Sequence, residues 1–334
     1  MKAVGYQRSL PVTAPQSLED IELPTPEVQG HDLLVRIEAV SVNPVDTKIR
    51  QNVSPEGGDY KVLGWDAAGV VEAVGNEVTL FQPGDKVWYA GAVDRSGTNA
   101  EFHQVDERIV SRMPTSLGFA EAAALPLTTI TAWEMLFDRL QVPTENAGSL
   151  LIIGAAGGVG SIMIQLAKRL TDLTVVATAS RPETRAWAQE LGADHVIDHR
   201  QSLVEELKAT GLASVEYVAS LSHTDQHLAE IAELIAPQGR LAVIDDPVSL
   251  DITPFKRKSV SVHWEFMFTR SLFQTTDMIE QHHLLERVAE MVDRGELVTT
   301  LAEEFGTINA DNLLRAHALL ESGKGRGKLV LKGF

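Results

Sequence analysis

Residues 1–110 of the 334-residue chain contain short segments that are either apolar throughout or alternate between apolar and polar residues. Turns rich in Pro, Gly and Asp separate these segments, which is typical of β-strands. Because no helical pattern of any length interrupts the region, we expect a barrel-like antiparallel domain. The expected strands are Met1–Tyr6, Leu33–Val42, Gly69–Val74, Asp85–Val87 and Glu101–Val105.

The pattern changes from residue 149 onward, where short apolar runs alternate with amphipathic segments at helical spacing. Short strands with helices between them predict a doubly wound parallel sheet. The expected strands are Leu150–Ile153, Val175–Thr178, His195–Ile197, Val215–Val218, Leu241–Ile244 and Val260–His263.

The remaining stretches predict helices and one last strand. The sequence FAEAAALPLTTITAWEML, which begins at Phe119, predicts two helical pieces broken at Pro126. Beyond the parallel sheet, the spacing predicts helices over Asp277–Arg294 and Asn309–Ser322, and a strand over Lys328–Leu331. The parallel-sheet domain is therefore expected as an insertion into a β-rich domain that both ends of the chain build.

The segment Ser149–Lys168 reads SLLIIGAAGGVGSIMIQLAK and predicts a strand, a glycine turn and a helix. It meets the pattern G-x-G-x-x-G in part, because Ala155 stands at the first glycine. Small residues let the backbone approach a pyrophosphate, and N–H groups at the helix start point at its charge. An ordinary strand-to-helix turn is the alternative, but the flanking strand and helix favour a dinucleotide. The predicted cofactor-binding residues of the turn are Ala156, Gly157, Gly158, Val159 and Gly160.

Composition narrows the function classes. The chain has 46 acidic and 29 basic side chains, a net charge of −17, which argues against nucleic acids and anionic membranes as partners. It has no cysteine, which excludes disulfides, thiolate nucleophiles and Cys-ligated zinc. The N-terminus lacks a signal-peptide core, and no apolar run approaches the length of a membrane helix. We therefore expect a cytoplasmic protein.

Seven segments occur in the same order in a known enzyme family. They are SVNPVDTKIR (41–50), LGWDAAGVVEAVG (63–75), FQPGDKVWYAG (81–91), AEAAALPLTTITAWEML (120–136), GAAGGVGSIMIQLAK (154–168), LGADHVID (191–198) and INADNLLRAHALLESGKGRGKLVL (308–331). On these segments the chain resembles the medium-chain dehydrogenase/reductase superfamily, specifically its zinc-free quinone oxidoreductase branch, and also the group called zinc-type alcohol dehydrogenase-like. The resemblance implies a Rossmann NADP(H)-binding domain over residues 124–266. It implies a GroES-like catalytic domain over residues 1–123 and 267–334.

The residues depart from the zinc-using branch of that family at its metal ligands. The matching positions hold Asn43, Trp65 and Leu127, and neither Trp nor Leu can ligate a metal. His223 and His227 have the spacing of a two-histidine metal face, but solvated surface histidines are the simpler interpretation. We therefore expect no metal.

The second strand of the parallel sheet indicates which nicotinamide cofactor is used. NAD-specific folds place an acidic residue near its end to bind the ribose 2′-OH, and Ala179 stands there. Ser180 and Arg181 follow, and a guanidinium offers charge-assisted hydrogen bonds to a 2′-phosphate. By similarity, His199 falls where relatives place a ring beside that phosphate. We expect NADPH, with a solvent-facing Arg181 as the alternative.

Without zinc, the oxyanion formed by hydride transfer to a carbonyl lacks its Lewis acid. Quinones and α,β-unsaturated carbonyls delocalise that charge, so the missing ligands favour reduction of these acceptors by NADPH. A metal-free carbonyl or alcohol reductase and a non-catalytic NADPH-binding sensor are the alternatives. The resemblance also implies a homodimer through the sheet edge near Leu241–His263.

The resemblance, residue by residue, implies the active-site positions. Asn43 is expected to donate to a substrate or nicotinamide carbonyl, Asp46 to order the active-site turn, and Thr131 to touch the nicotinamide ribose. Packing or turn stabilisation is the alternative for each. The candidates for the substrate cleft are Lys48, Trp65, Tyr89, Phe266 and Phe268.

Overall fold

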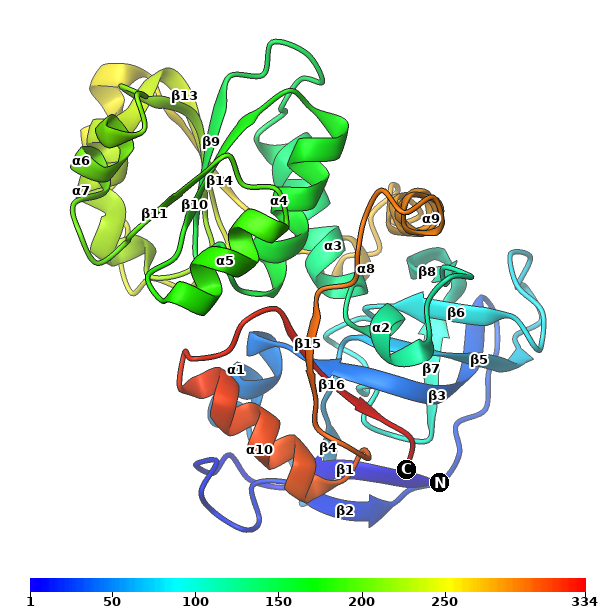
Figure 1. Ribbon diagram of the computed structural model, residues 1–334. Helices are drawn as coiled ribbons and strands as arrows, with labels where there is room; N and C mark the ends of the chain where they lie inside the picture. Colours follow the sequence, from blue (N-terminus) through cyan, green and yellow to red (C-terminus); the bar gives the residue numbers. More distant parts are fainter. The chain divides into compact units, whose positions relative to one another are not determined.

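The computed structural model describes all 334 residues, which form two compact units (Figure 1). Unit 1 contains Met1–Ile130 and Phe268–Phe334, and unit 2 contains Thr131–Met267. Unit 2 is therefore one continuous insertion into unit 1, which is the arrangement that the sequence predicts. The divisions fall at 130/131 and 267/268, against the expected 123/124 and 266/267. No helix is long and apolar enough to span a membrane.

The strands of unit 2 form one six-stranded sheet in the order β11-β10-β9-β12-β13-β14, and every neighbouring pair is parallel. This confirms the predicted doubly wound sheet. The order reverses between β9 and β12, which is the point where such sheets bind ligands at the carboxyl ends of their strands. The strands are β9 (Ser149–Ile153), β10 (Thr174–Thr178), β11 (His195–Ile197), β12 (Val215–Ser220), β13 (Ile235–Val243) and β14 (Ser261–Trp264).

Helices cover both faces of this sheet, with α4 and α5 on one face and α6 and α7 on the other (Figure 1). A strand covered on both faces has no solvent-facing side, so all five residues of β9 are buried and apolar or small. The helical elements of unit 2 are η2 (Glu134–Arg139, a π-helix), α4 (Gly158–Leu170), α5 (Pro182–Glu190), α6 (Leu203–Ala209), α7 (Thr224–Leu234) and η3 (Thr253–Lys258).

Unit 1 is built on a seven-stranded sheet in the order β15-β16-β3-β5-β6-β8, with β7 also pairing with β3, and on a three-stranded sheet β2-β1-β4. All pairs are antiparallel except β15 with β16, so the antiparallel expectation is confirmed for most of the domain. The strands are β1 (Lys2–Tyr6), β2 (Glu19–Glu22), β3 (Asp32–Val42), β4 (Lys61–Val62), β5 (Ala67–Val74), β6 (Lys86–Tyr89), β7 (Phe102–Asp106), β8 (Val110–Arg112), β15 (Leu301–Glu304) and β16 (Lys328–Lys332).

The helices predicted for unit 1 are present, and the structure adds three that the sequence analysis does not predict: α1, η1 and α8. The stretch around Pro126 forms two helices, and Asn309 caps the last helix through its side chain. The helical elements are α1 (Pro44–Asn52), η1 (Glu107–Ile109), α2 (Phe119–Ala123), α3 (Pro126–Trp133, which crosses into unit 2), α8 (Thr269–Leu272), α9 (Glu280–Asp293) and α10 (Ala310–Glu321).

The expectation that residues 1–110 contain no helix is wrong, because α1 lies there. Its sequence, PVDTKIRQN, shows no apolar stripe, and the residues it buries are Asp46, Thr47 and Arg50. The Arg50 side chain is fully buried; its Nε donates to His317 Nδ1 over 3.2 Å, and its Nη2 pairs with Glu321. Polar contacts with α10, rather than the packing of an apolar stripe, therefore hold α1 in place.

Candidate functional site

A buried polar cluster in unit 1 surrounds the carboxylate of Asp66, which follows the Gly64-Trp65 turn. Asp66 Oδ2 accepts from Ser41 Oγ at 2.9 Å, from Asn43 Nδ2 at 3.0 Å and from Lys328 Nζ at 2.9 Å. Lys328 Nζ also donates to Asn43 Oδ1 and to the carbonyl of Val42. The side chains of Lys328 and Asp66 are 3% and 0% exposed, so this ion pair is shielded from water.

The second carboxylate of the cluster, Asp46, organises the start of α1. Its Oδ2 accepts the backbone N–H of Asn43 at 2.6 Å, and its Oδ1 accepts that of Gly64 at 3.1 Å. Asp46 thus joins the helix start to the turn that carries Asp66, while its role in an active-site turn stays a prediction. Burial raises the pKa of Asp46 to about 7, while the Asn43 N–H and the Lys328 charge act in the opposite direction.

Asn43 is held inside the cluster by both ends of its side-chain amide. Its side chain is 1% exposed, and both ends of its amide make hydrogen bonds inside the cluster, with Lys328 on the oxygen and Asp66 on the nitrogen. In this structure Asn43 is a positioning residue for that ion pair. Its direct donation to a substrate carbonyl stays a prediction.

Sequence reasoning missed Lys328 and Asp66 as site residues. Lys328 was assigned only to the terminal strand, and 262 positions separate it from Asp66. The usable signal is a lysine directly before the apolar run Leu329–Leu331 of the last strand. Its pairing becomes visible only because β16 runs antiparallel to β3 and brings Leu329 opposite Val42, next to Asn43.

The cluster does not fit a catalytic zinc ion. The three positions that match the zinc ligands hold an amide engaged by Lys328, an indole whose N–H donates to the carbonyl of Ala92, and a leucine. An ammonium group beside Asn43 and Asp66 would repel a divalent cation. No group of three or more His, Asp or Glu side chains is arranged to hold a metal ion.

The five residues expected to line the substrate cleft fall into different environments. Trp65 and Phe268 are buried and meet edge to face, with ring centroids 6.3 Å apart. Tyr89 is fully buried, and its hydroxyl donates to His103 Nδ1 over 3.0 Å, because His103 Nε2 faces the carbonyl of Ser96. Lys48 is exposed on α1, and Phe266 is 49% exposed in unit 2. Their contact with a substrate stays a prediction.

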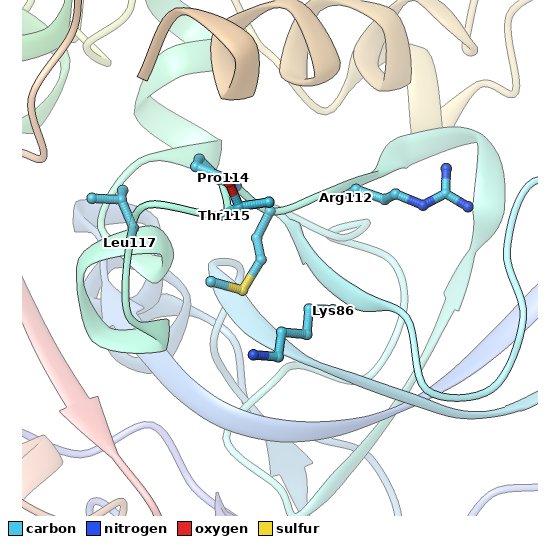
Figure 2. A pocket seen from close by; sticks show the side chains of 6 residues that line it. Lys86, Arg112, Pro114, Thr115 and Leu117 are labelled. Carbon is cyan, nitrogen blue, oxygen red and sulfur yellow. The ribbon is translucent and has the colours of Figure 1, made fainter. Parts of the chain in front are cut away.

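A cavity of about 270 Å³ in unit 1 contains none of these residues (Figure 2). Lys86 and Arg112 extend in different directions from its wall (Figure 2). The Lys86 ammonium lies 5.5 Å from the Phe119 ring centroid, and Arg112 pairs with Asp85 at 3.2 Å. The two cations therefore do not converge on one ligand.

The glycine turn of unit 2 has the geometry that a dinucleotide requires. Gly154 directly follows β9 and has φ +82°, a conformation that L side chains rarely adopt. A Cβ on Gly160 would lie 2.4 Å from the carbonyl oxygen of Ala155, so only glycine lets α4 pack against the turn. Gly157 caps α4 and is exposed, which leaves the helix N-terminus open to an anion. These residues fit a bound pyrophosphate.

The loops after β10 and β11 bring the expected 2′-phosphate residues together. Arg200, which the sequence analysis did not select, donates from Nη2 to the carbonyl of Ser180 at 3.0 Å and to Asp198 at 2.7 Å. It thereby ties Ser180 to the loop of His199. Burial lowers the pKa of His199, and nearby positive charge from His227, Arg200 and His223 acts in the same direction. Arg181 caps α5 and pairs with Glu183 at 3.1 Å.

Comparison with known proteins identifies the family. Residues 29–133 match the alcohol dehydrogenase GroES-like domain, and residues 191–331 match the zinc-binding dehydrogenase model. A zinc-type alcohol dehydrogenase-like protein of Staphylococcus aureus is 41% identical over 99% of both chains. The chain belongs to the medium-chain dehydrogenase/reductase superfamily. It is therefore an oxidoreductase of that superfamily.

Further relatives carry more specific names. The 2-methylene-furan-3-one reductase of Solanum lycopersicum is 30% identical over 92% of this chain and 73% of its own length. A Rhizobium etli structure, provisionally described as a zinc-dependent alcohol dehydrogenase, is 59% identical over 100% of this chain and 98% of its own, with a TM-score of 0.97. The quinone oxidoreductase of Pseudomonas syringae is 28% identical over 99% of both chains, with a TM-score of 0.83.

Replacing Lys328 tests the ion pair. We expect Lys328→Met to lower the free energy of unfolding by about 3–5 kcal/mol, because it leaves the Asp66 carboxylate buried without its cation. The double variant Lys328→Met/Asp66→Asn should recover part of that loss, since the uncompensated charge is gone. Urea unfolding measures both.

Lys332→Met on the same strand is the matched control, because the Lys332–Glu304 pair is exposed. It should cost less than about 1 kcal/mol. Equal losses for Lys328→Met and Lys332→Met, or no recovery in the double variant, would contradict the role of the pair.

Proposed function

We propose that the protein is an NADPH-dependent reductase of quinones or α,β-unsaturated carbonyls that works without a catalytic metal. The observation that carries this proposal is the Asn43–Asp66–Lys328 cluster at the family's zinc position. Its charges are satisfied internally, so it offers no Lewis acid to an isolated carbonyl. A conjugated acceptor needs less stabilisation from the protein, because it delocalises the charge of the oxyanion over several atoms.

The relatives support this class of acceptor. One related structure is a quinone oxidoreductase, and the tomato relative is named for a ketone conjugated to a methylene group. NADPH, when bound, supplies the hydride. The chain's own residues bind and orient: the Gly157–Gly160 turn holds the pyrophosphate, Thr131 the nicotinamide ribose, and Asp46 keeps the catalytic turn in register. Solvent protonates the enolate or quinol oxyanion.

NADPH is favoured over NADH by charge at the ends of β10 and β11. No carboxylate stands at Ala179, where it would repel a 2′-phosphate, and Ser180 offers a hydroxyl beside it. Arg181, Arg200 and His199 supply positive charge or hydrogen-bond donors on the adjoining loops. Arg181 would exchange its exposed partner Glu183, a weak pairing, for the phosphate.

The direct test is the oxidation of NADPH with a panel of quinones, enones and unconjugated aldehydes, with and without a chelator. We expect turnover with the quinones or enones that the chelator does not change. Turnover with aldehydes alone would favour a carbonyl reductase instead. Binding of NADPH without turnover of any acceptor would show a sensor, and loss of activity with the chelator would show a required metal.

Cofactor choice is tested at Arg181. We expect a much lower KM for NADPH than for NADH, and Arg181→Ala should raise the KM for NADPH about tenfold while leaving that for NADH unchanged. Arg169→Ala, on the last turn of α4, is the control for loss of a surface arginine. Equal use of the two cofactors by the wild type would refute the assignment.

We also propose that the protein forms a homodimer through β14. This strand is the edge of the unit 2 sheet, and an edge strand presents unpaired N–H and C=O groups. Beside it Trp264 is 57% exposed, and Ile252 in the preceding segment is 52% exposed. An apolar edge of this kind is suited to pairing with a second copy.

Light scattering of the purified protein should give the mass of a dimer. Trp264→Glu should shift it toward the monomer, because it places a charge at the edge of an already acidic protein. Phe273→Glu, an equally drastic change at an exposed site in unit 1, should leave the dimer intact. A monomeric wild type would overturn this proposal.

A further inference from the structure

Side-chain hydrogen bonds connect α5 to the glycine turn of unit 2. The indole N–H of Trp187 on α5 donates to Ser161 Oγ on α4 over 2.8 Å. Ser161 Oγ in turn donates to the carbonyl of Gly157 over 2.7 Å, and the Ser161 N–H donates to the same carbonyl over 2.9 Å. A helical serine often makes the bond to the carbonyl four residues before it, whereas the indole adds a link to a second helix. Ser161 is 0% exposed, so this link is shielded from water.

The two ends of this link lie where the proposed cofactor carries phosphate. Gly157 caps α4 in the turn that fits a pyrophosphate. At the other end, Arg181 caps α5 and stands beside the expected 2′-phosphate. The first turns of α5 are held to the sheet by Arg185, which donates to the carbonyl of Ala179 over 3.1 Å and to that of Val196 over 2.7 Å. Trp187 therefore links two places that one dinucleotide would occupy.

Strand β10 connects the same two places from the side of the sheet. The N–H of Gly154 in the glycine turn donates to Thr178 Oγ1 over 3.0 Å. Thr178 is the last residue of β10, three positions before Arg181. On the helical side, α4 and α5 cover the same face of the sheet (Figure 1). The glycine turn and the start of α5 are thus joined through β10 and, separately, through Trp187.

We propose that Trp187 is a positioning residue that determines cofactor specificity, because through Ser161 it fixes the separation between the glycine turn and the start of α5. The inference rests on the proposed function, in which NADPH places its pyrophosphate at the turn and its 2′-phosphate beside Arg181. A ligand that makes two contacts gains most when both binding groups are already correctly spaced, since the second contact then costs little further ordering. NADH lacks the 2′-phosphate and is therefore less sensitive to this spacing.

Trp187→Phe tests the link, because it removes the indole N–H and keeps an aromatic ring. Calorimetry compares the binding of NADPH, NADH and 2′-AMP, which carries a 2′-phosphate and no pyrophosphate. We expect the affinity for NADPH relative to NADH to fall about three- to tenfold, the effect of one lost hydrogen bond. The affinity for 2′-AMP should not change, since this ligand occupies the start of α5 alone. Trp264→Phe, the same change at an exposed indole of unit 2, should leave all three affinities unchanged.

Ser161→Ala removes the acceptor of the same hydrogen bond. Ser161→Ala and the double variant Trp187→Phe/Ser161→Ala should both show the affinity ratio of Trp187→Phe, because either change breaks the one link. A further loss of the ratio in the double variant would show that the two residues act separately, and it would overturn the inference. If Trp187→Phe does not fold, Ser161→Ala takes its place with the same three ligands.

The outcomes separate this inference from the proposed function. Equal losses of affinity for all three ligands would show that Trp187 only stabilises the fold, and an unchanged ratio of NADPH to NADH affinity would exclude its part in specificity; either result overturns the inference. A wild type that binds NADPH no more tightly than NADH would refute the proposed cofactor and the inference with it. The expected binding contrasts without turnover of any acceptor would support the role of Trp187 and refute the proposed reductase.

Discussion

The ion pair of Lys328 with Asp66 is the interaction on which the arrangement of unit 1 depends. It joins the last strand of the chain to the turn after β4, across an insertion that contains all of unit 2. Both charges are buried, so their removal from water is costly, and only close pairing with further hydrogen bonds offsets that cost. Ser41, Asn43 and the N–H of Leu127 supply those bonds.

Polar contacts rather than apolar packing place the elements around this cluster. Arg50 is fully buried and secures α1 to α10, while Asp46 joins the start of α1 to Gly64. A buried charge has few satisfactory arrangements, because each donor and acceptor needs a partner at a fixed distance. The Gly64–Asp66 turn and the start of α1 are thereby defined by a small number of hydrogen bonds.

Two local arrangements in unit 2 also depend on particular residues. At the glycine turn, Gly160 is required because any side chain there would meet the backbone of Ala155. At the segments leading into and out of the unit, Arg139 lies within 4 Å of the buried carboxylates of both Glu134 and Glu265. The first arrangement fits a pyrophosphate, and the second joins the start of η2 to the residue that follows β14.

The sequence by itself determined the inserted parallel sheet, the glycine turn and the absence of zinc ligands at Asn43, Trp65 and Leu127. These features are local: apolar runs, glycine spacing and residue type are readable without knowing what packs where. It did not reveal α1, whose buried residues are polar, or the engagement of Asn43 and Tyr89 with Lys328 and His103. Only the tertiary structure decided these, because a buried polar group is defined by a partner that lies far away along the chain.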